Sequence, residues 1–246
     1  MDLGSHTVFI TGGASGIGFA LAQRFLSAGS DVIVCGRREE KLQEVKQKYP
    51  SLHIHACDVS QATNRVSLFE WVTQEFPKVN ILVNNAGIQR RFQLMQNSSW
   101  EGIEEEIAIN LEAPLHLSTL FIPHLLKQDR PAIINITSGL AFVPMANAPI
   151  YCATKAALRS FTLSLRHQLS ATPISVVEII PPAVNTDLGG KGLHSTATPL
   201  DEFADAVVEQ LQKGSLEISY GFATQSSRAS REELNETFKR MNQAAR

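Results

Sequence analysis

Two hydrophobic patterns alternate along the 246-residue chain. The first is a short run of consecutive apolar, often β-branched residues, which is typical of a strand buried on both faces of a parallel sheet. The second is an apolar position every three or four residues, which indicates an amphipathic helix. Strands are expected at 7–10, 31–35, 53–56, 81–84, 132–137, 175–180 and 216–220. Helices are expected at 19–26, 41–49, 62–76, 103–126, 155–169, 200–213 and 231–241.

This alternation of strands and helices predicts successive βαβ units, which join parallel strands through right-handed crossovers. We therefore expect an α/β fold, a doubly wound sandwich with a parallel sheet of about seven strands and helices on both faces. The length suits a single domain over residues 1–246, without repeats or linkers. Residues 188–198, rich in Gly, Ser and Thr, are expected to form a mobile lid, and residues 222–246 a helical C-terminal extension.

Composition narrows the classes of partner. The net charge is −2 and the pI about 6.4, so the chain lacks the basic excess that nucleic acid or an anionic membrane attracts. It has no apolar run of the roughly 18 residues that a membrane helix needs, and its N-terminus does not resemble a signal peptide. Cys35, Cys57 and Cys152 have neither metal-ligand nor disulfide spacing. We expect a cytoplasmic protein that binds neither nucleic acid nor membrane and holds no metal.

A glycine-rich turn follows the first expected strand and leads into a helix. It reads Thr11-Gly12-Gly13-Ala14-Ser15-Gly16-Ile17-Gly18. Glycines in such a turn let the backbone approach a pyrophosphate, and the start of the helix presents free N–H groups and the positive end of its dipole. The spacing Thr-Gly-x-x-x-Gly-x-Gly is a variant of Gly-x-Gly-x-x-Gly. The strand before it and the helix after it predict a Rossmann-like dinucleotide-binding domain.

The end of the second expected strand bears on the choice of cofactor. A carboxylate there would hydrogen-bond the ribose hydroxyls of NAD, but the sequence reads Cys35-Gly36-Arg37-Arg38. Two guanidinium groups suit the 2′-phosphate of NADP by charge and by their planar array of donors. The sequence therefore favours NADP(H) over NAD(H). If both arginines only face solvent, the alternative is an NAD-linked alcohol dehydrogenase of the same fold.

Further motifs follow the glycine turn in a fixed order. They are Asp58-Val59, Asn84-Asn85-Ala86-Gly87, the separate residues Asn110, Ser138, Tyr151 and Lys155, and Pro181-Pro182-Ala183-Val184-Asn185-Thr186. With this ordered set, the chain closely resembles the short-chain dehydrogenase/reductase family over roughly residues 5–225. The resemblance is to its Tyr-x-x-x-Lys type, whose members are oxidoreductases.

The resemblance implies roles for these residues. A catalytic tetrad is expected at Asn110, Ser138, Tyr151 and Lys155. Contacts with the cofactor are expected from Gly12, Ser15, Gly16, Ile17, Gly18, Arg37, Arg38, Asp58, Val59, Asn85, Ala86, Gly87, Tyr151, Lys155, Pro181, Val184 and Thr186. Pro182 departs from the family pattern, in which glycine is usual. Proline fixes φ and removes an N–H donor, so we expect the turn beside the nicotinamide to differ in shape.

The spacing of Tyr151 and Lys155 suggests their chemistry. Residues i and i+4 lie on one face of a helix, so the ammonium group can approach the ring. A free phenol has a pKa of about 10, and a nearby cation favours the phenolate and lowers that pKa. We expect Lys155 to tune Tyr151 in this way for general acid and base catalysis. The resemblance adds that Ser138 holds the substrate oxygen and that Asn110 holds a water linking Lys155 to solvent.

The expected reaction transfers a hydride between NADP(H) and a carbonyl or secondary alcohol. An apolar segment at 140–147 favours a hydrophobic ketone or aldehyde, whereas Arg90 or Arg91 could meet an acidic group. A rival from another class is a non-catalytic regulator that only senses the dinucleotide. The complete tetrad argues against it, because a sensor does not need Tyr151 and Lys155. Family members pair the long helices that here span 103–126 and 155–169, which implies a homodimer or homotetramer.

Overall fold

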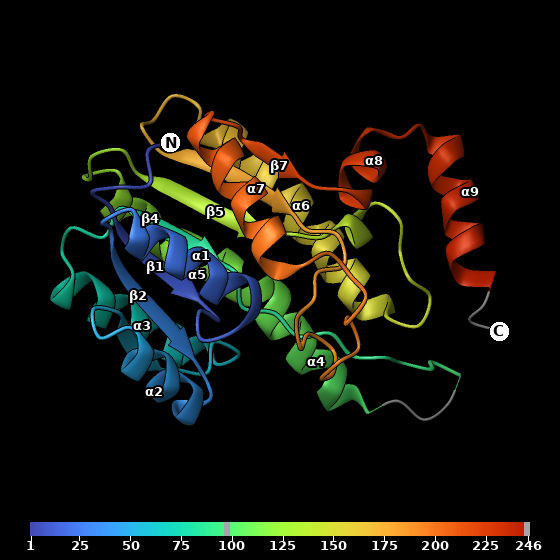
Figure 1. Ribbon diagram of the computed structural model, residues 1–246, viewed down its shortest axis with the longest axis horizontal. Coiled ribbons are helices and arrows are strands. Elements are labelled where there is room, and N and C mark those ends of the chain that lie inside the picture. Colours follow the sequence, from blue (N-terminus) through green and yellow to red (C-terminus); the bar gives the residue numbers. More distant parts are fainter. Residues whose placement is uncertain (96–98, 244–246) are drawn as a thin grey trace.

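The structure is a computed structural model that describes residues 1–95 and 99–243. At its centre lies one sheet of seven parallel strands in the order β3-β2-β1-β4-β5-β6-β7 (Figure 1). The strands are β1 (Thr7–Thr11), β2 (Asp31–Gly36), β3 (His53–Ala56), β4 (Ile81–Asn84), β5 (Ala132–Ile136), β6 (Ser175–Ile180) and β7 (Glu217–Ser219). The expected parallel sheet is confirmed.

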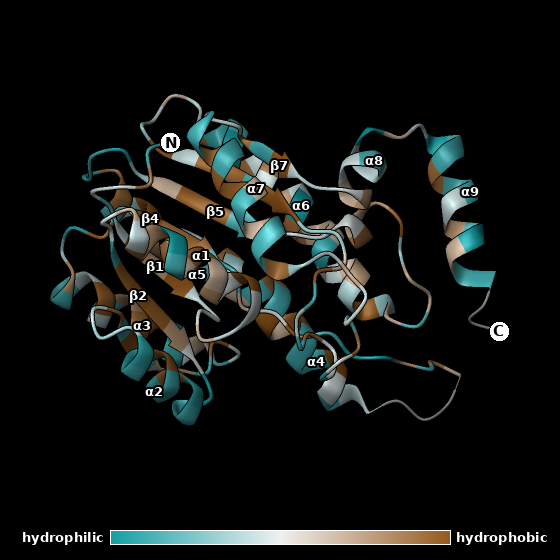
Figure 2. Ribbon diagram, in the orientation of Figure 1, coloured by the Kyte–Doolittle hydropathy of each residue, from teal (hydrophilic) through white to brown (hydrophobic). Residues whose placement is uncertain are grey.

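The central strands form where the sequence is mostly apolar, whereas the edge strands β3 and β7 contain polar and exposed residues. Every residue of β4 and β5 is buried, as a parallel sheet covered on both faces requires. Ile10 pairs in register with Val34 on one side and with Val83 on the other, so three branched side chains lie in one row. Figure 2 shows the strands as hydrophobic and the outer surfaces of the helices as largely hydrophilic.

Helices cover both faces of the sheet. On one face α1 (Gly16–Ser27), α2 (Glu39–Lys48) and α7 (Leu200–Gln212) pack against side chains such as Val8 and Ile10. On the other face α3 (Ala62–Glu75), α5 (Ala113–Leu125) and α6 (Pro149–Gln168) pack against residues such as Phe9 and Ile33. Neighbouring residues of one strand thus enter opposite cores, and the expected doubly wound sandwich is confirmed.

The strand order places a crevice at the middle of the sheet. The chain passes outward from β1 through β2 to β3, then returns to the other side of β1 to form β4. The loops that leave β1 and β4 at their carboxyl ends therefore run in opposite directions. In open α/β sheets ligands bind in the crevice that this reversal creates.

The long helix expected at 103–126 has an irregular middle. It consists of α4 (Trp100–Ile107), a π-helical turn (Ala108–Glu112) and α5. Pro114 has no N–H to donate to the carbonyl of Asn110 one turn earlier, and Ala113 N instead donates to Ala108 O. The wider turn changes the direction in which Asn110 projects, and a helical period alone does not reveal such an insertion.

Two helices differ from expectation nearer the C-terminus. Helix α6 begins at Pro149, six residues earlier than predicted, because proline is suited to the first helical turn. Tyr151 therefore lies within this turn. Within the expected helical extension at 222–246 lie a short helix, α8 (Phe222–Arg228), for which no separate range was expected, and α9 (Arg231–Asn242), whose first turn carries a capping box. Helix α9 has no buried residue and stands apart from the sheet (Figure 1).

Residues 188–198, expected to form a lid, contain turns rather than a helix or strand. Gly189, Gly190 and Gly192 all have positive φ, a conformation that side chains with a Cβ disfavour. Val184 and Thr198 form an isolated bridge that brings the two ends of this segment together. Within the ranges that the structure describes, no helix is both long and apolar enough to span a membrane.

Candidate active site

A cavity of about 900 Å³ opens at the carboxyl ends of the strands. Its walls come from the glycine turn, the ends of β2, β4 and β5, the first turns of α6 and the segment 181–189. These parts are far apart in sequence and meet because parallel strands end at the same edge. Of the residues expected to contact a cofactor, all line this cavity except Gly18.

The glycine turn is held close to the end of β4. Gly12 has a φ of +65°, and a Cβ placed on it would lie 2.9 Å from the Cα of Ala86. A Cβ on Gly18 would lie only 2.3 Å from Asn85 Nδ2. Gly18 therefore allows α1 to approach the loop after β4, which gives it a packing role in addition to the expected cofactor contact.

Two polar side chains hold the glycine turn close to the loop after β4. Asn85 Nδ2 donates to the carbonyl oxygens of Thr11 (2.9 Å) and Gly12 (3.2 Å). Thr11 Oγ1 accepts from the backbone N–H groups of Asn85 (3.1 Å) and Ala86 (3.0 Å). The Asn-Asn-Ala-Gly motif thus shapes the floor of the cavity. Our sequence reading did not single out Thr11, although its place at the end of β1 beside the glycine turn was a usable signal.

Positive charge gathers at one end of the cavity. Arg37 and Arg38 both line it, as does Lys41, which we had not predicted. Arg37 forms an ion pair with Glu105 of α4, and Arg38 Nη2 donates to Ser15 Oγ at 3.2 Å. Each of the two arginines therefore contacts another side chain of the protein and does not only face solvent.

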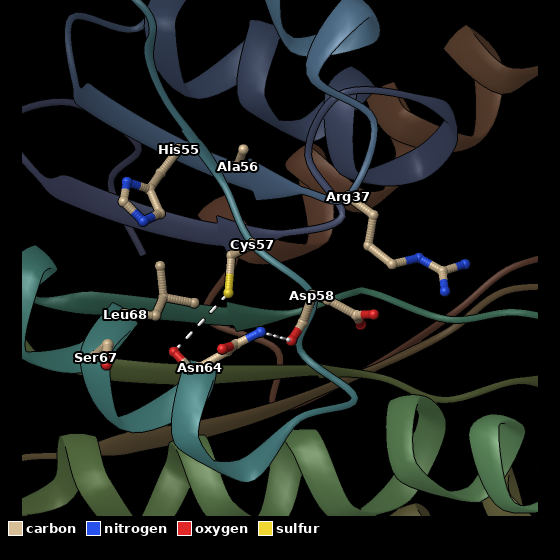
Figure 3. Close-up of a pocket in the computed structure, with 8 residues that line it drawn as sticks. All are labelled: Arg37, His55, Ala56, Cys57, Asp58, Asn64, Ser67 and Leu68. Atoms are coloured by element: carbon tan, nitrogen blue, oxygen red, sulfur yellow. Dashed lines mark hydrogen bonds between the residues drawn. The ribbon is translucent and has the colours of Figure 1, made fainter.

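A smaller hollow of about 430 Å³ borders the same end (Figure 3). It is lined by Arg37, His55, Ala56, Cys57, Asp58, Asn64, Ser67 and Leu68. Asp58 Oδ1 accepts from the N–H of Ser60 at 3.0 Å, which fixes the turn after β3. Arg37 and Asp58 belong to both spaces, so the hollow extends the large cavity toward β3.

Tyr151, Lys155 and Ser138 meet at the other end of the cavity. Lys155 Nζ lies 5.7 Å from the centre of the Tyr151 ring and donates to the carbonyl oxygen of Ile136 at 2.7 Å. Ser138 forms a hydrogen bond with the phenol, and its Oγ also accepts from Leu140 N at 3.1 Å. The three side chains lie on two elements, because Ser138 follows β5 and the other two belong to α6.

Burial shifts the pKa values of Tyr151 and Lys155. It raises the pKa of Tyr151 to about 12, although the hydrogen bond with Ser138 opposes the rise. It lowers the pKa of Lys155 to about 8. In the protein without a cofactor, burial therefore raises the pKa of the phenol, whereas we expected Lys155 to lower it.

Asn110 lies behind the pair and is not among the described residues that line the cavity. Its Oδ1 accepts from Ile88 N (2.9 Å) and its Nδ2 donates to Ile88 O (2.8 Å) and Thr154 Oγ1 (3.3 Å). Thr154 precedes Lys155, so Asn110 joins the loop after β4 to α6. The structure thus brings the four members of the expected tetrad into one region, three at the wall and one behind it.

Glu106 of α4 is a further ionisable residue of this region. It is fully buried, and burial raises its pKa to about 7. One carboxyl oxygen accepts from Arg90 N at 3.4 Å, and the other has no partner among the described residues. The neighbouring Glu104 is exposed, so the signal for burial was only its helical period.

The remaining wall is mixed in character. It includes Gln89, Arg90, Leu140, Met145, Leu188, His194, Phe222 and Met241. Arg90 is engaged by the carboxylate of Glu105 and by Gly102 O (2.8 Å), so its charge is already compensated. Arg91 is exposed and is not among the lining residues described. Thr186 and Pro182 both line the cavity, and Thr186 Oγ1 accepts from Leu188 N at 3.4 Å.

A doubly wound parallel sheet, a glycine-walled crevice at its point of reversal and a buried Tyr–Lys pair beside it define the class of dinucleotide-dependent oxidoreductases. Comparison with known proteins makes the assignment specific. The pattern of the short chain dehydrogenase family matches residues 6–195. The chain therefore belongs to the short-chain dehydrogenase/reductase family.

Two relatives are similar in sequence. An uncharacterised oxidoreductase of Bacillus subtilis (strain 168), DltE, is 44% identical over 98% of both chains. The NADP-dependent 3-hydroxy acid dehydrogenase YdfG of Escherichia coli (strain K12) is 33% identical over 71% of both chains.

Two solved structures are similar in fold. A short-chain dehydrogenase of Sphingobium yanoikuyae in complex with NADPH has a TM-score of 0.79, with 25% identity and coverage of 98% of this chain and 95% of that one. A 3-ketoacyl-(acyl-carrier-protein) reductase of Brucella melitensis in complex with NADH has a TM-score of 0.80, with 26% identity and coverage of 90% and 99%. Neighbours thus bind either nicotinamide dinucleotide.

Proposed function

We propose that the protein is an NADP(H)-dependent oxidoreductase that interconverts a carbonyl compound and a secondary alcohol, with Tyr151 as general acid and base. The observation that carries the proposal is the meeting of Ser138, Tyr151 and Lys155 at the wall of a cavity whose floor is the glycine turn. The membership of the family supports this assignment of roles.

The shape and charge of the cavity fit such a cofactor. A side chain at Gly12 would collide with Ala86, so the turn keeps backbone accessible where a pyrophosphate needs it. Arg37, Arg38 and Lys41 suit a 2′-phosphate at the opposite end from Tyr151. Asp58 and Val59 would border the adenine, and Asn85, Ala86, Gly87, Pro181, Val184 and Thr186 the rest of the dinucleotide.

Each side chain at the reacting end has a defined role. Ser138 holds the substrate oxygen by a hydrogen bond, and Tyr151 donates a proton to that oxygen during reduction or removes it during oxidation. Lys155 keeps a positive charge beside the phenol and would bind ribose hydroxyls. Asn110 fixes the loop after β4 against α6, which sets the position of Lys155. The bound nicotinamide supplies or accepts the hydride, and its oxidised, cationic form favours the phenolate.

The wall around this end favours a substrate that is largely apolar. Leu140, Met145, Leu188 and Phe222 line it, and the charge of Arg90 is compensated by Glu105. A hydrophobic ketone or aldehyde therefore fits better than a carboxylic acid, although the relative YdfG acts on 3-hydroxy acids. We further propose that the protein works in the cytoplasm and assembles as a homodimer or homotetramer, as implied by the family.

Equilibrium binding of NADPH and NADH to the wild type and to Arg37→Ala tests the cofactor. We expect NADPH to bind at least about tenfold more tightly, a difference of about 1.4 kcal/mol, and the variant to lose most of that difference. Arg130→Ala, a change at an exposed arginine far from the cavity, is the control. Equal or tighter binding of NADH would instead support the NAD-linked alternative.

Turnover on a panel of ketones and aldehydes separates an enzyme from a dinucleotide sensor. An enzyme oxidises NADPH with at least one carbonyl compound, and Tyr151→Phe abolishes this while cofactor binding persists. A sensor binds NADPH but gives no turnover with any compound of the panel, and that result would contradict the proposed reaction.

A further inference from the structure

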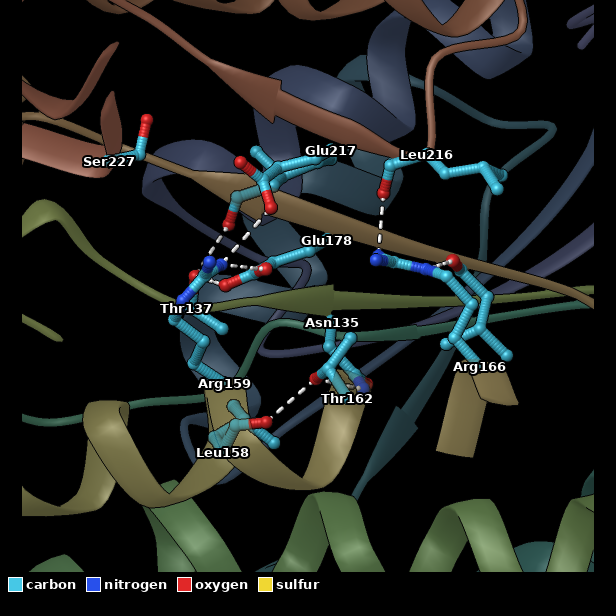
Figure 4. Close-up of polar contacts among 12 residues, drawn as sticks. Asn135, Thr137, Leu158, Arg159, Thr162, Arg166, Glu178, Leu216, Glu217 and Ser227 are labelled. Carbon is cyan, nitrogen blue, oxygen red and sulfur yellow. Dashed lines mark hydrogen bonds and ion pairs between the residues drawn. The ribbon is translucent and has the colours of Figure 1, made fainter. Parts of the chain in front are cut away.

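A buried carboxylate lies on β6, outside the tetrad. Glu178 is fully buried, although its neighbours along the strand are apolar and pack into the two cores. Its two oxygens have different partners (Figure 4). Oε1 accepts from Thr137 Oγ1 at 2.7 Å, and Oε2 pairs with Arg159 of α6.

The first partner leads directly to Ser138. Thr137 is the residue before Ser138, and its side chain lies between Glu178 Oε1 and the carbonyl oxygen of Ile179 (3.3 Å). Its backbone N–H also donates to Ile179 O at 2.9 Å. On the other side of Ser138, Gly139 N donates to Pro181 O at 2.9 Å. The orientation of Ser138 is thus set by contacts made on either side of it.

The second partner leads to the helix that carries Tyr151 and Lys155. Arg159 stands one turn after Lys155, and its Nη1 reaches both Glu178 and Glu217 Oε2 (3.2 Å). The guanidinium carbon lies 4.3 Å from the centre of the Phe142 ring. Arg159 therefore fixes α6 against β6 and against the segment between Ser138 and Tyr151.

The charge of Glu178 makes this arrangement specific. Burial raises the pKa of its carboxyl group, as does the charge of Glu217, while the hydrogen bond from Thr137, the charge of Arg159 and, least of all, the charge of Arg166 lower it. A buried ion pair contributes little net stability compared with apolar side chains of the same size, but it requires defined geometry. An apolar residue would fill this place on β6 at least as well, so the fold alone does not explain Glu178.

We propose that Glu178 is a positioning residue for Ser138: through Thr137 and Arg159 it holds the serine in register with Tyr151 and Lys155. This rests on the proposed function, because it assigns Ser138 to the substrate oxygen. Arg166, two turns beyond Arg159, offers a contrast. It donates to the carbonyl oxygens of Val176 and Leu216, both at 2.8 Å, and so ties the same helix to the same strands without reaching Thr137 (Figure 4).

The test uses Thr137→Val, which removes the hydroxyl group and leaves Glu178 and Arg159 in place, together with Glu178→Gln. Thr137→Ser restores the hydroxyl group, and Arg166→Met is the matched control. We expect kcat to fall about tenfold or more in Thr137→Val and Glu178→Gln, with Kd for NADPH unchanged, and to recover in Thr137→Ser. Arg166→Met should keep kcat within about twofold of the wild type, because its contacts lie away from Ser138.

The pH profile distinguishes positioning from general loss of structure. The hydrogen bond with Ser138 lowers the pKa of Tyr151, whereas Glu106 of α4 and Cys152 beside it raise that pKa. Displacing Ser138 should therefore move the acidic limb of the profile for alcohol oxidation, the rise that follows ionisation of Tyr151, to higher pH in Thr137→Val. Arg166→Met should leave that limb in place.

Amide hydrogen exchange gives a readout that does not depend on turnover. Peptides covering 137–142 should exchange at least about fivefold faster in Thr137→Val and Glu178→Gln than in wild type, and at the wild-type rate in Thr137→Ser and Arg166→Met. Unchanged exchange in both variants, or wild-type kcat in both, would overturn the positioning role. A wild type without turnover but with faster exchange in both variants would overturn the proposed reaction and retain the role of Glu178 in holding this segment.

Discussion

The pKa values of Tyr151 and Lys155 follow from burial more than from charged neighbours. Tyr151 and Lys155 have pKa values displaced toward their neutral forms because both are removed from water. A reductase benefits from a phenol that keeps its proton until the substrate oxygen takes it. The positive charge of an oxidised nicotinamide would then be needed for the reverse reaction, since the phenol alone ionises only in strong alkali.

Glu106 provides a prediction at this scale. Its pKa is raised to about 7, above the ordinary value of about 4.5, so the folded protein holds this proton more tightly than the unfolded chain. The free energy of unfolding should therefore fall by about 3 kcal/mol as pH rises from about 4.5 to about 7. In Glu106→Gln the side chain stays neutral at every pH. The free energy of unfolding of the variant, relative to wild type, should therefore rise by this amount between pH 4 and pH 8.

Urea denaturation of both proteins at the two pH values measures the difference. Glu104→Gln, a change at the exposed neighbour on the same helix, is the control and should show no such gain. A constant difference between Glu106→Gln and wild type across this range would mean that the carboxyl group is not desolvated as the structure indicates.

Which residues of the site were predictable depends on how they reach it. Residues at strand ends, such as Ser138 and Arg37, were accessible from the sequence, because parallel strands deliver their carboxyl ends to one edge. Lys41 and Met241 were not, because they enter the cavity wall through the packing of helices. The burial of Glu106 was not predictable for the same reason, since it depends on what α4 packs against.

At the scale of elements, the close approach of α1 to the loop after β4 depends on one glycine. In Gly18→Ala the added Cβ would lie 2.3 Å from Asn85 Nδ2 and 2.7 Å from Gly12 O. The helix or the loop must move, and we expect the free energy of unfolding to fall by about 2–3 kcal/mol, with weaker NADPH binding as the glycine turn shifts. Thermal and urea denaturation measure the first effect, and equilibrium titration the second.

Gly36→Ala is the matched control for stability. A Cβ at Gly36 would meet no described atom within 4 Å, so this variant should unfold within about 0.5 kcal/mol of wild type. Equal stability of Gly18→Ala and Gly36→Ala would show that the α1 contact is looser than the structure has it.

The elements themselves were predicted well where the pattern was long and regular. Each expected strand matches an observed one within two residues at either end, and the match is best explained for the central strands, where continuous burial leaves a clear apolar run. The short helix α8 lies in the expected helical extension, but its own bounds were not predicted, because seven residues carry too little periodicity. The π-helical turn was missed because an extra residue in a turn is invisible to a helical period, although Pro114 marked where the regular pattern had to fail.

At the scale of the whole molecule, apolar residues remain exposed on the helices through which family members pair. Leu163 on α6 and Leu126 at the end of α5 are 42% and 44% exposed. We expect sedimentation to give a dimer or tetramer at micromolar concentration, and Leu163→Glu to shift it toward monomer by placing a charge in the interface. Leu193→Glu, at a similarly exposed leucine in the segment 188–198, should not change the assembly. A wild-type monomer would contradict the proposed association.

The pairing of Glu105 has a consequence for how the two ends of the cavity communicate. One carboxylate is the counter-ion of both Arg37, which follows β2, and Arg90, which follows β4, and both arginines line the cavity. An anion that binds Arg37 breaks its ion pair with Glu105, so that Glu105 pairs with Arg90 alone. An acid that binds Arg90 leaves Glu105 paired with Arg37 alone. Because such linkage is reciprocal, occupancy at either end changes the electrostatic potential felt at the other, without any movement of the backbone.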